Sequence, residues 1–388
     1  MDEKEFELIK KAVHNIHNAR QAYRHGCEVE SLDVVGLKLT NRCNLRCKHC
    51  YEWNNEGYHH SMDISMQSED MPYEVIEKCI EETKESKPTF YLWGGEPLIY
   101  GHIQKLLNRL ADENYVVAIC TNGHYVLKYL EELKRFGSNL EIVIALEGME
   151  KENDIIRGTG SFNKVAEVIA TLSKLKKEGL FKGKITVHTM ISNENVFTIK
   201  EYIQLMKDWG VENLILCLPW YLSSKISRDM DKFYNEKFDW LSFNNLKEHS
   251  WHAFKYKIRP ELYADVLEAV DIIQKQDWGF NVRLQPDIKN KNTIIEFLKG
   301  ENAIEDKSKR CLSLYSRIDV LPSGFVTSCK HFPEFTVGDL NKERVADVWR
   351  SQDMNRIRSI FKEGMAPVCS KCNNLYLHGY NNKGKNNE

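Results

Sequence analysis

The chain has 388 residues, and its 54 lysines and arginines against 56 aspartates and glutamates give a formal net charge of −2. The length fits two domains or one elaborated barrel, and the charge balance disfavours nucleic-acid binding through a broad basic face. No apolar run approaches the roughly 20 residues that span a membrane, and the start MDEKEFELIKK is too charged for a signal peptide. The sequence therefore predicts a cytoplasmic globular protein whose eleven cysteines favour metal binding or catalysis over disulfides.

Short apolar runs and amphipathic segments alternate along the first half of the chain, after an expected N-terminal helical extension over residues 1–33. Buried parallel strands are predicted at 34–39, 89–93, 116–120, 141–146, 184–191 and 214–218, with helices at 73–86, 102–113, 125–136, 162–179 and 198–210. Six strand–helix repeats predict an α/β fold, a partial (β/α)6 TIM-like barrel over residues 34–220. In such barrels the chemistry lies at the C-terminal ends of the strands.

The remaining sequence departs from this alternation. Residues 221–300 begin with an aromatic-rich stretch, which we expect to form a connector that packs in the core or lines a substrate site. Residues 301–388 contain four cysteines and a polar tail, and we expect a small separate domain there.

Three cysteines directly follow the first predicted strand. Cys43, Cys47 and Cys50 have the spacing C-x3-C-x2-C. Three thiolates on a short loop can hold three irons of a cubane cluster and leave the fourth iron open to another ligand. A zinc loop is the alternative, although structural zinc sites have four ligands that usually come in pairs.

A second set of cysteines lies in the last quarter of the chain. Cys311 and Cys329 are separated by seventeen residues, and Cys369 and Cys372 form a C-x2-C pair. Four cysteines in two pairs suit either a zinc ion or a fully ligated iron–sulfur cluster, and the number of ligands does not decide between them.

The first cysteine loop, followed one strand later by Gly94-Gly95-Glu96-Pro97, resembles the radical S-adenosylmethionine (SAM) superfamily. The resemblance implies a [4Fe–4S] cluster on Cys43, Cys47 and Cys50 whose open iron binds SAM, and reductive cleavage of SAM to a 5′-deoxyadenosyl radical. The segment 157–162 also resembles the RG-x-GSF sequence of relatives with extra clusters. The residues implied to contact SAM are His49, Gly94, Gly95, Glu96, Pro97, Thr121, Glu147, Arg157 and Asn193.

The C-terminal cysteines, with PSG at 322–324 and GDLNKERVADVWRS at 338–351, resemble the SPASM/Twitch extension of radical SAM maturases. The full SPASM pattern has seven cysteines, whereas His378 and Asn382 occupy two of the later positions here. The resemblance therefore implies the shorter Twitch form, in which Cys311, Cys329, Cys369 and Cys372 ligate one auxiliary [4Fe–4S] cluster. It also implies two clusters in all and an electron donor such as flavodoxin or ferredoxin.

Cys217, at the end of the sixth predicted strand, has two interpretations. Its thiol could donate a hydrogen atom to a substrate radical, as in radical SAM epimerases, or it could simply be buried, as we expect for Cys27, Cys79 and Cys120. The family resemblance favours a peptide maturase that performs crosslinking, epimerisation or oxidation. The alternatives are a dehydrogenase or epimerase of a sugar or aminocyclitol and, more remotely, a non-enzymatic iron–sulfur or zinc protein.

Overall fold

The computed structural model describes residues 3–25, 32–241, 246–301, 310–372 and 375, so Cys27, His378 and Asn382 lie outside the described residues. Within these residues one sheet has the strand order β10-β9-β8-β1-β2-β3-β4-β5-β6-β7. All neighbouring pairs from β8 through β1 to β7 are parallel, whereas the β8–β9 and β9–β10 pairs are antiparallel. The strands are β1 Val34–Lys38, β2 Thr89–Trp93, β3 Val117–Thr121, β4 Leu140–Ala145, β5 Lys184–Met190, β6 Asn213–Cys217, β7 Asn281–Gln285, β8 Arg317–Val320, β9 Phe325–Thr327 and β10 Thr336–Asp339.

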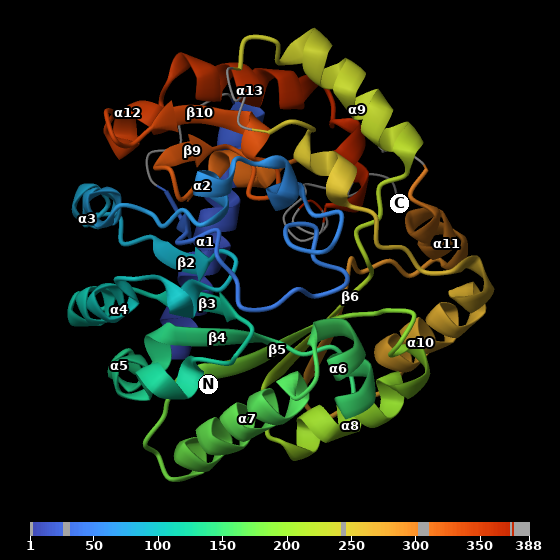
Figure 1. The fold of residues 1–388 in the computed structure, drawn as a ribbon. Helices are drawn as coiled ribbons and strands as arrows, with labels where there is room; N and C mark the ends of the chain where they lie inside the picture. The colour runs from blue at the N-terminus through green and yellow to red at the C-terminus, as the bar shows by residue number, and fades with distance from the viewer. Residues whose placement is uncertain (1–2, 26–31, 242–245, 302–309, 373–374, 376–388) are drawn as a thin grey trace, which may run out of the picture.

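Helices cover the outer side of the curved parallel sheet, as in a partial barrel (Figure 1). Those that follow β2 to β5 are α4 Ile103–Asp112, α5 Leu130–Arg135, α6 Glu150–Arg157, α7 Ser161–Lys177 and α8 Ile199–Asp208. The others are α1 Glu3–His25, α2 Ile64–Gln67, α3 Tyr73–Glu82, α9 Ser224–Lys237, α10 Tyr263–Lys275, α11 Lys291–Lys299, α12 Val345–Trp349 and α13 Gln352–Glu363. All six predicted strands match observed strands to within one residue at each end, so the α/β partial-barrel prediction is confirmed.

Two strands extend the parallel sheet beyond the six that the sequence predicted. Strand β7 pairs with β6, which places Gln285 beside Cys217, and β8 pairs with β1 at the opposite edge. Both strands escape the sequence analysis because they are not continuous apolar runs. Strand β8 contains Arg317 and Asp319, which are paired with each other at 2.5 Å. The sheet therefore links the barrel to the C-terminal region without a break.

The aromatic-rich segment packs largely as core between the barrel and the C-terminal region. Trp251 is fully buried, and Phe238 packs against Phe335 with ring centroids 5.1 Å apart. Phe254 instead stacks on Tyr51, directly after the first cysteine loop, with centroids 4.3 Å apart. Part of the segment therefore reaches the mouth of the barrel.

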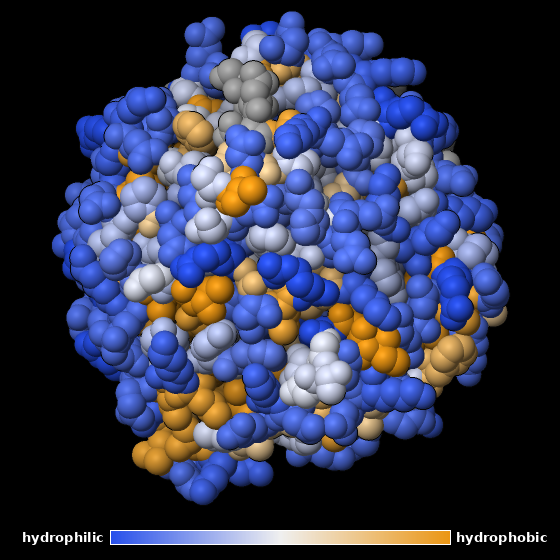
Figure 2. All heavy atoms as spheres, in the orientation of Figure 1, coloured by the Kyte–Doolittle hydropathy of each residue, from blue (hydrophilic) through white to orange (hydrophobic). Residues whose placement is uncertain are grey.

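The molecular face in the orientation of Figure 1 is predominantly hydrophilic, with small hydrophobic clusters between the charged side chains (Figure 2). Within the described residues, none of the helices combines the length and apolarity needed to cross a membrane.

Candidate functional site

The first cysteine loop is held at the C-terminal end of β1 by a compact set of polar contacts. The guanidinium of Arg42 donates two hydrogen bonds to Asp70, of 3.0 and 2.5 Å, and the Thr40 hydroxyl donates to the same carboxylate. The Trp53 indole donates to the carbonyl oxygen of Asn41 at 2.7 Å. These contacts fix both ends of the loop, so the three cysteines between them have defined positions.

The three loop thiols fit an iron–sulfur cluster better than a zinc ion. All three are free of disulfides. A cubane takes each thiolate on a different iron and can leave its fourth iron open, whereas a structural zinc ion takes four ligands and this loop offers three thiols. Burial raises the pKa of Cys43 to about 11 and that of Cys50 to about 12. Binding of a cluster would therefore release protons, because its ligands are thiolates.

Glycines 94 and 95 allow the loop after β2 to lie directly against the first cysteine loop. A Cβ atom on Gly95 would lie 2.1 Å from the carbonyl oxygen of Arg42, and one on Gly94 would lie 2.5 Å from that of Thr40. Gly94 also has a φ of +153°. These positions admit only glycine without movement of the backbone. The glycine pair therefore allows the two loops to pack backbone against backbone.

Replacement of Gly95 by alanine is expected to weaken SAM binding at least about tenfold, because the Cβ atom must push the Glu96 loop away from the cysteine loop. The overpacking should also lower the free energy of unfolding by about 1–3 kcal/mol. Equilibrium dialysis of SAM on the reconstituted protein and urea unfolding measure the two effects. Gly364→Ala is the control, because nothing lies within 4 Å of its Cβ position. Equal SAM affinities in the two variants would contradict this role.

Glu96 lies fully buried at the C-terminal end of β2, where three donors hold its carboxylate. The Thr121 hydroxyl and the Leu98 amide donate to Oε1 at 2.7 and 2.9 Å, and the Asn122 amide donates to Oε2 at 2.7 Å. Burial raises the pKa of Glu96, although these hydrogen bonds oppose the shift. The structure thus brings Glu96 and Thr121 together, as expected for one site, and Pro97 starts the short 3₁₀ turn Pro97–Ile99 that follows.

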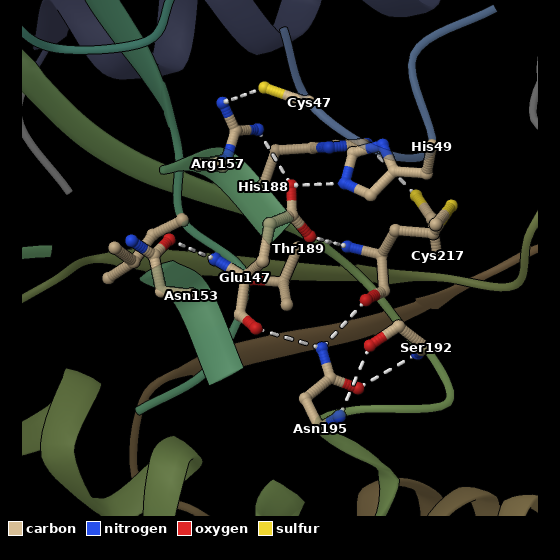
Figure 3. A network of polar contacts seen from close by, with 12 residues as sticks. Cys47, His49, Glu147, Asn153, Arg157, His188, Thr189, Ser192, Asn195 and Cys217 are labelled. Carbon is tan, nitrogen blue, oxygen red and sulfur yellow. Dashed lines mark hydrogen bonds and ion pairs between the residues drawn. The ribbon is translucent and has the colours of Figure 1, made fainter. Parts of the chain in front are cut away.

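A buried ion-pair network joins the cysteine loop to the ends of β4 and α6 (Figure 3). The Arg157 guanidinium donates to Glu147 at 2.7 Å and lies 3.7 Å from the Cys47 sulfur. His49 Nε2 lies 3.2 Å from the same Glu147 oxygen, whose partner oxygen accepts from the Met190 amide at 2.7 Å. Burial disfavours a charged Glu147, but His49 and Arg157 hold its pKa well below the usual range. The positive charge of Arg157 beside the Cys47 sulfur would stabilise an anionic group, such as a thiolate, on the cysteine loop.

Asn193 does not point into this network. Its side-chain amide donates to the carbonyl oxygen of Lys257 at 3.0 Å, and its side-chain oxygen accepts from the Arg259 amide at 2.8 Å. The fully buried Asn195 lies in the network instead, where its side chain donates to the carbonyl oxygens of Glu147 and Met190 (Figure 3). The sequence analysis missed Asn195, since two asparagines two residues apart look equivalent without the fold.

Cys217 lies inside the barrel beside His188 of β5. The Cys217 sulfur is 2.9 Å from His188 Nε2 and 3.6 Å from the Gln285 side-chain oxygen (Figure 3). Burial raises the pKa of Cys217 and lowers that of His188 to about 4, so a neutral thiol faces a neutral imidazole. A protonated thiol is the form that can donate a hydrogen atom. The sequence suggested the thiol but gave no signal for His188 or Gln285.

Cys79 is fully buried in α3, which confirms its expected packing role, whereas Cys120 is only partly buried. Cys120 lies on β3 close to the Tyr91 hydroxyl on β2. A second thiol therefore lies toward the interior of the barrel.

The four C-terminal cysteines line a single cavity. Cys311 precedes the 3₁₀ turn Leu312–Tyr315, Cys329 follows β9, and Cys369 and Cys372 lie on and just after the turn Pro367–Lys371. Each is free of disulfides, and apolar side chains such as Phe335 and Phe361 form much of the wall. Burial raises the pKa of Cys329 and of Cys369, and neighbouring cysteines raise it further. Four thiols that line one largely apolar cavity fit a fully ligated cluster.

The chain resembles known proteins along most of its length. Residues 37–206 match the radical SAM superfamily, and residues 311–373 match the SPASM iron–sulfur cluster-binding domain. Pre-heme d1 synthase of Dinoroseobacter shibae is 30% identical over 47% of this chain, a match that spans 42% of the synthase. The subtilosin biosynthesis protein AlbA of Bacillus subtilis is 22% identical over 89% of this chain and 67% of AlbA. The crystal structure of Streptococcus suis SuiB bound to precursor peptide SuiA has a TM-score of 0.59, at 15% identity, over 92% of this chain and 74% of SuiB.

The protein is thus an iron–sulfur enzyme that uses SAM. The chain belongs to the radical SAM superfamily and carries a SPASM iron–sulfur cluster-binding domain at its C-terminal end.

Proposed function

We propose that the chain holds two [4Fe–4S] clusters with separate tasks. The barrel of residues 34–220 would bind the SAM-cleaving cluster through Cys43, Cys47 and Cys50. The domain over 301–388 would bind an auxiliary cluster through Cys311, Cys329, Cys369 and Cys372, and residues 221–300 would connect the two. The position of those four thiols on the wall of one cavity supports the second cluster. A fully ligated cluster relays electrons, with flavodoxin or ferredoxin as the cytoplasmic donor.

When bound, the first cluster and SAM supply reductive cleavage to the 5′-deoxyadenosyl radical. We infer that Glu96, held by Thr121 beside the glycine pair, accepts from the SAM amino group. Arg157 and Glu147 would stabilise the charges around the cysteine loop, and His49 would lie against the adenine. Asn193 would act indirectly, by fixing the 256–259 segment, because its contacts lie there.

We propose a peptide as substrate, which makes the enzyme a maturase. The support is the similarity over most of the chain, auxiliary domain included, to AlbA and to SuiB with its bound precursor peptide. Chemistry on a sugar, aminocyclitol or other small molecule is the second candidate. Tyr51, Phe254 and Trp220 form an aromatic wall that would also suit a flat or ring-shaped substrate, and one relative is named for a heme precursor.

The test is a comparison of substrates on the anaerobically reconstituted enzyme. Short peptides encoded beside the gene, and aminocyclitols as the alternative, are each incubated with SAM and a reductant. A mass change in a peptide, with one 5′-deoxyadenosine formed per event, is expected, and a Cys43→Ala variant should give none. Turnover of an aminocyclitol with unchanged peptides would replace the proposal by its alternative.

We further propose that Cys217 donates a hydrogen atom to the substrate radical. The S–H bond breaks, a C–H bond forms on the substrate, and a thiyl radical remains on Cys217. One electron from the reduced flavodoxin or ferredoxin and one proton then restore the thiol. Burial beside His188 and Gln285 supports this role, because it keeps the sulfur protonated and oriented.

This role predicts a result that needs no substrate. If SAM is cleaved in D2O without substrate, the 5′-deoxyadenosyl radical should take deuterium from the exchanged Cys217 thiol. Mass spectrometry should then detect deuterated 5′-deoxyadenosine. Cys217→Ala should lose most of the label, whereas Cys79→Ala, which removes a core thiol from α3, should keep it. Label that persists in Cys217→Ala and disappears in Cys120→Ala would assign the donor to Cys120 instead.

A further inference from the structure

Lys330 reaches from the residue after Cys329 across to β2, where its ammonium group has a neutral partner. It donates to the Tyr91 hydroxyl at 3.0 Å and lies 4.2 Å from the centroid of that ring and 5.0 Å from the centroid of Trp93. No carboxylate in the described part of the chain forms an ion pair with it, because the neighbouring Asp319 is engaged by both nitrogens of Arg317. Lys330 is partly buried, and a cation removed from water without a counter-charge is costly unless something else pairs with it.

Other polar groups near Lys330 also lack partners. The indole nitrogens of Trp93 and Trp220 and both ring nitrogens of His331 are buried with no hydrogen-bond partner. His331 and Trp220 are adjacent, with ring centroids 4.2 Å apart. An unpaired buried polar group destabilises the fold, and such groups are rare enough in native proteins to require an explanation. Two indole donors, an imidazole and an ammonium group on one wall together suit a ligand that accepts hydrogen bonds and carries negative charge.

Lys330 also lies near the thiols on the inner side of the barrel. The charge of Lys330 acts on His188, the partner of Cys217, and Lys330 also lies close to Cys120. His331 lies 6.4 Å from the Tyr51 ring, which stacks on Phe254. A ligand held by Lys330 would thus have aromatic side chains along its apolar part and a thiol within the same space.

Lys330 and His331 both line the auxiliary cavity, so the ammonium group of Lys330 could instead compensate the charge of the cluster there. The direction of the Lys330 side chain favours the inner side of the barrel. The ammonium group bonds to Tyr91 on β2 and lies over the rings of Tyr91 and Trp93 on the same barrel strand.

We propose that Lys330 anchors a carboxylate group of the substrate in the barrel chamber, with the Trp220 indole and the His331 ring completing the cradle. The carboxylate could belong to an aspartate or glutamate side chain, to a peptide C-terminus or to a small organic acid, which share the same recognition chemistry. The inference rests on the proposed function, because it assigns the anion to the substrate of that site.

The first experiment needs no knowledge of the substrate. Acetylation of lysines by N-acetoxysuccinimide is followed by peptide mass spectrometry on the reconstituted full-length enzyme, with glutarate or with neutral glutaramide as the probe. Near-saturating glutarate should slow modification of Lys330 at least about tenfold. Glutaramide should not, and the exposed Lys342 is the internal control. An unchanged rate at Lys330, together with a shifted midpoint potential of the auxiliary cluster in Lys330→Met, would overturn the proposal in favour of charge compensation.

The second experiment distinguishes this inference from the peptide proposal. A pool of short random-sequence peptides, with free or amidated C-termini, is retained on the enzyme and sequenced. If the anchored carboxylate is a side chain, wild type, Lys330→Arg and Lys342→Met should enrich acidic peptides. If it is the peptide C-terminus, the same three proteins should enrich only peptides with a free C-terminus. Lys330→Met should lose the enrichment in either case. Retained peptides with the same composition in wild type and Lys330→Met would refute the anchor but keep the peptide proposal. Protection of Lys330 by glutarate, with no peptide retained, would keep the anchor and refute the peptide proposal. The substrate would then be a small organic acid.

Discussion

Serine in place of Cys47 is expected to reduce 5′-deoxyadenosine formation from SAM to background. Cys47 is the loop cysteine that contacts Arg157, so its loss removes one of the three proposed iron ligands and also leaves a buried arginine facing a weaker ligand. An alcohol binds iron far less readily than a thiolate does, because it keeps its proton at neutral pH. The cluster should fail to assemble or to hold SAM, and the iron content should fall by about four per chain.

The measurements are iron analysis and chromatography of 5′-deoxyadenosine after reduction by dithionite. Cys79→Ser is the matched control, because it changes a buried thiol in α3 that contacts neither cluster loop. It should keep both the iron and the cleavage activity. Undiminished cleavage by Cys47→Ser would mean that another residue supplies the third ligand.

Methionine in place of Arg157 is expected to cost about 3–5 kcal/mol of unfolding free energy, because it strands the buried Glu147 carboxylate without its cation. The double variant Arg157→Met/Glu147→Leu should recover much of the loss, since no buried charge then remains. Urea unfolding under anaerobic conditions measures both. The exposed pair Arg135–Asp112 is the control, and Arg135→Met should cost less than about 1 kcal/mol.

The same pair predicts a dependence on pH. The pKa of Glu147 is lower in the folded chain than in the unfolded chain, so its stabilising contribution is present above the ordinary value of 4.5 and is lost as the pH falls below it. The difference in stability between wild type and Arg157→Met should therefore shrink below about pH 4. A constant difference from neutral pH to pH 3 would show that Glu147 is not the group that Arg157 stabilises.

The barrel strands could be predicted closely because each is a short apolar run, buried on one face and partly buried on the other, as TFYLW and EIVIAL illustrate. Strand β8 could not, because Arg317 and Asp319 interrupt its apolar pattern and are neutralised only by each other in the fold. Two charged residues in so short a segment predict an exposed position unless the strands that pair with it are known.

The site divides in the same way. The candidate cluster cysteines could be proposed from their spacing, which is local in sequence and constrained by the geometry of a cluster. The contacts of Arg157 with Cys47, of His188 with Cys217 and of Lys330 with Tyr91 join residues that are 110, 29 and 239 positions apart. Such contacts depend on which strands are neighbours in the barrel. A single lysine or histidine carries no mark of that neighbourhood, so His188 and Lys330 became candidates only with the structure.

Iron content per chain, in wild type and in the double variant Cys369→Ala/Cys372→Ala, tests the central claim of two separate clusters most directly. Both proteins are reconstituted anaerobically and desalted before analysis. Wild type should hold about eight irons, and the variant should hold about four while it keeps the absorbance of the barrel cluster. About four irons in both proteins would contradict the account, because the C-terminal cysteines would then hold no cluster.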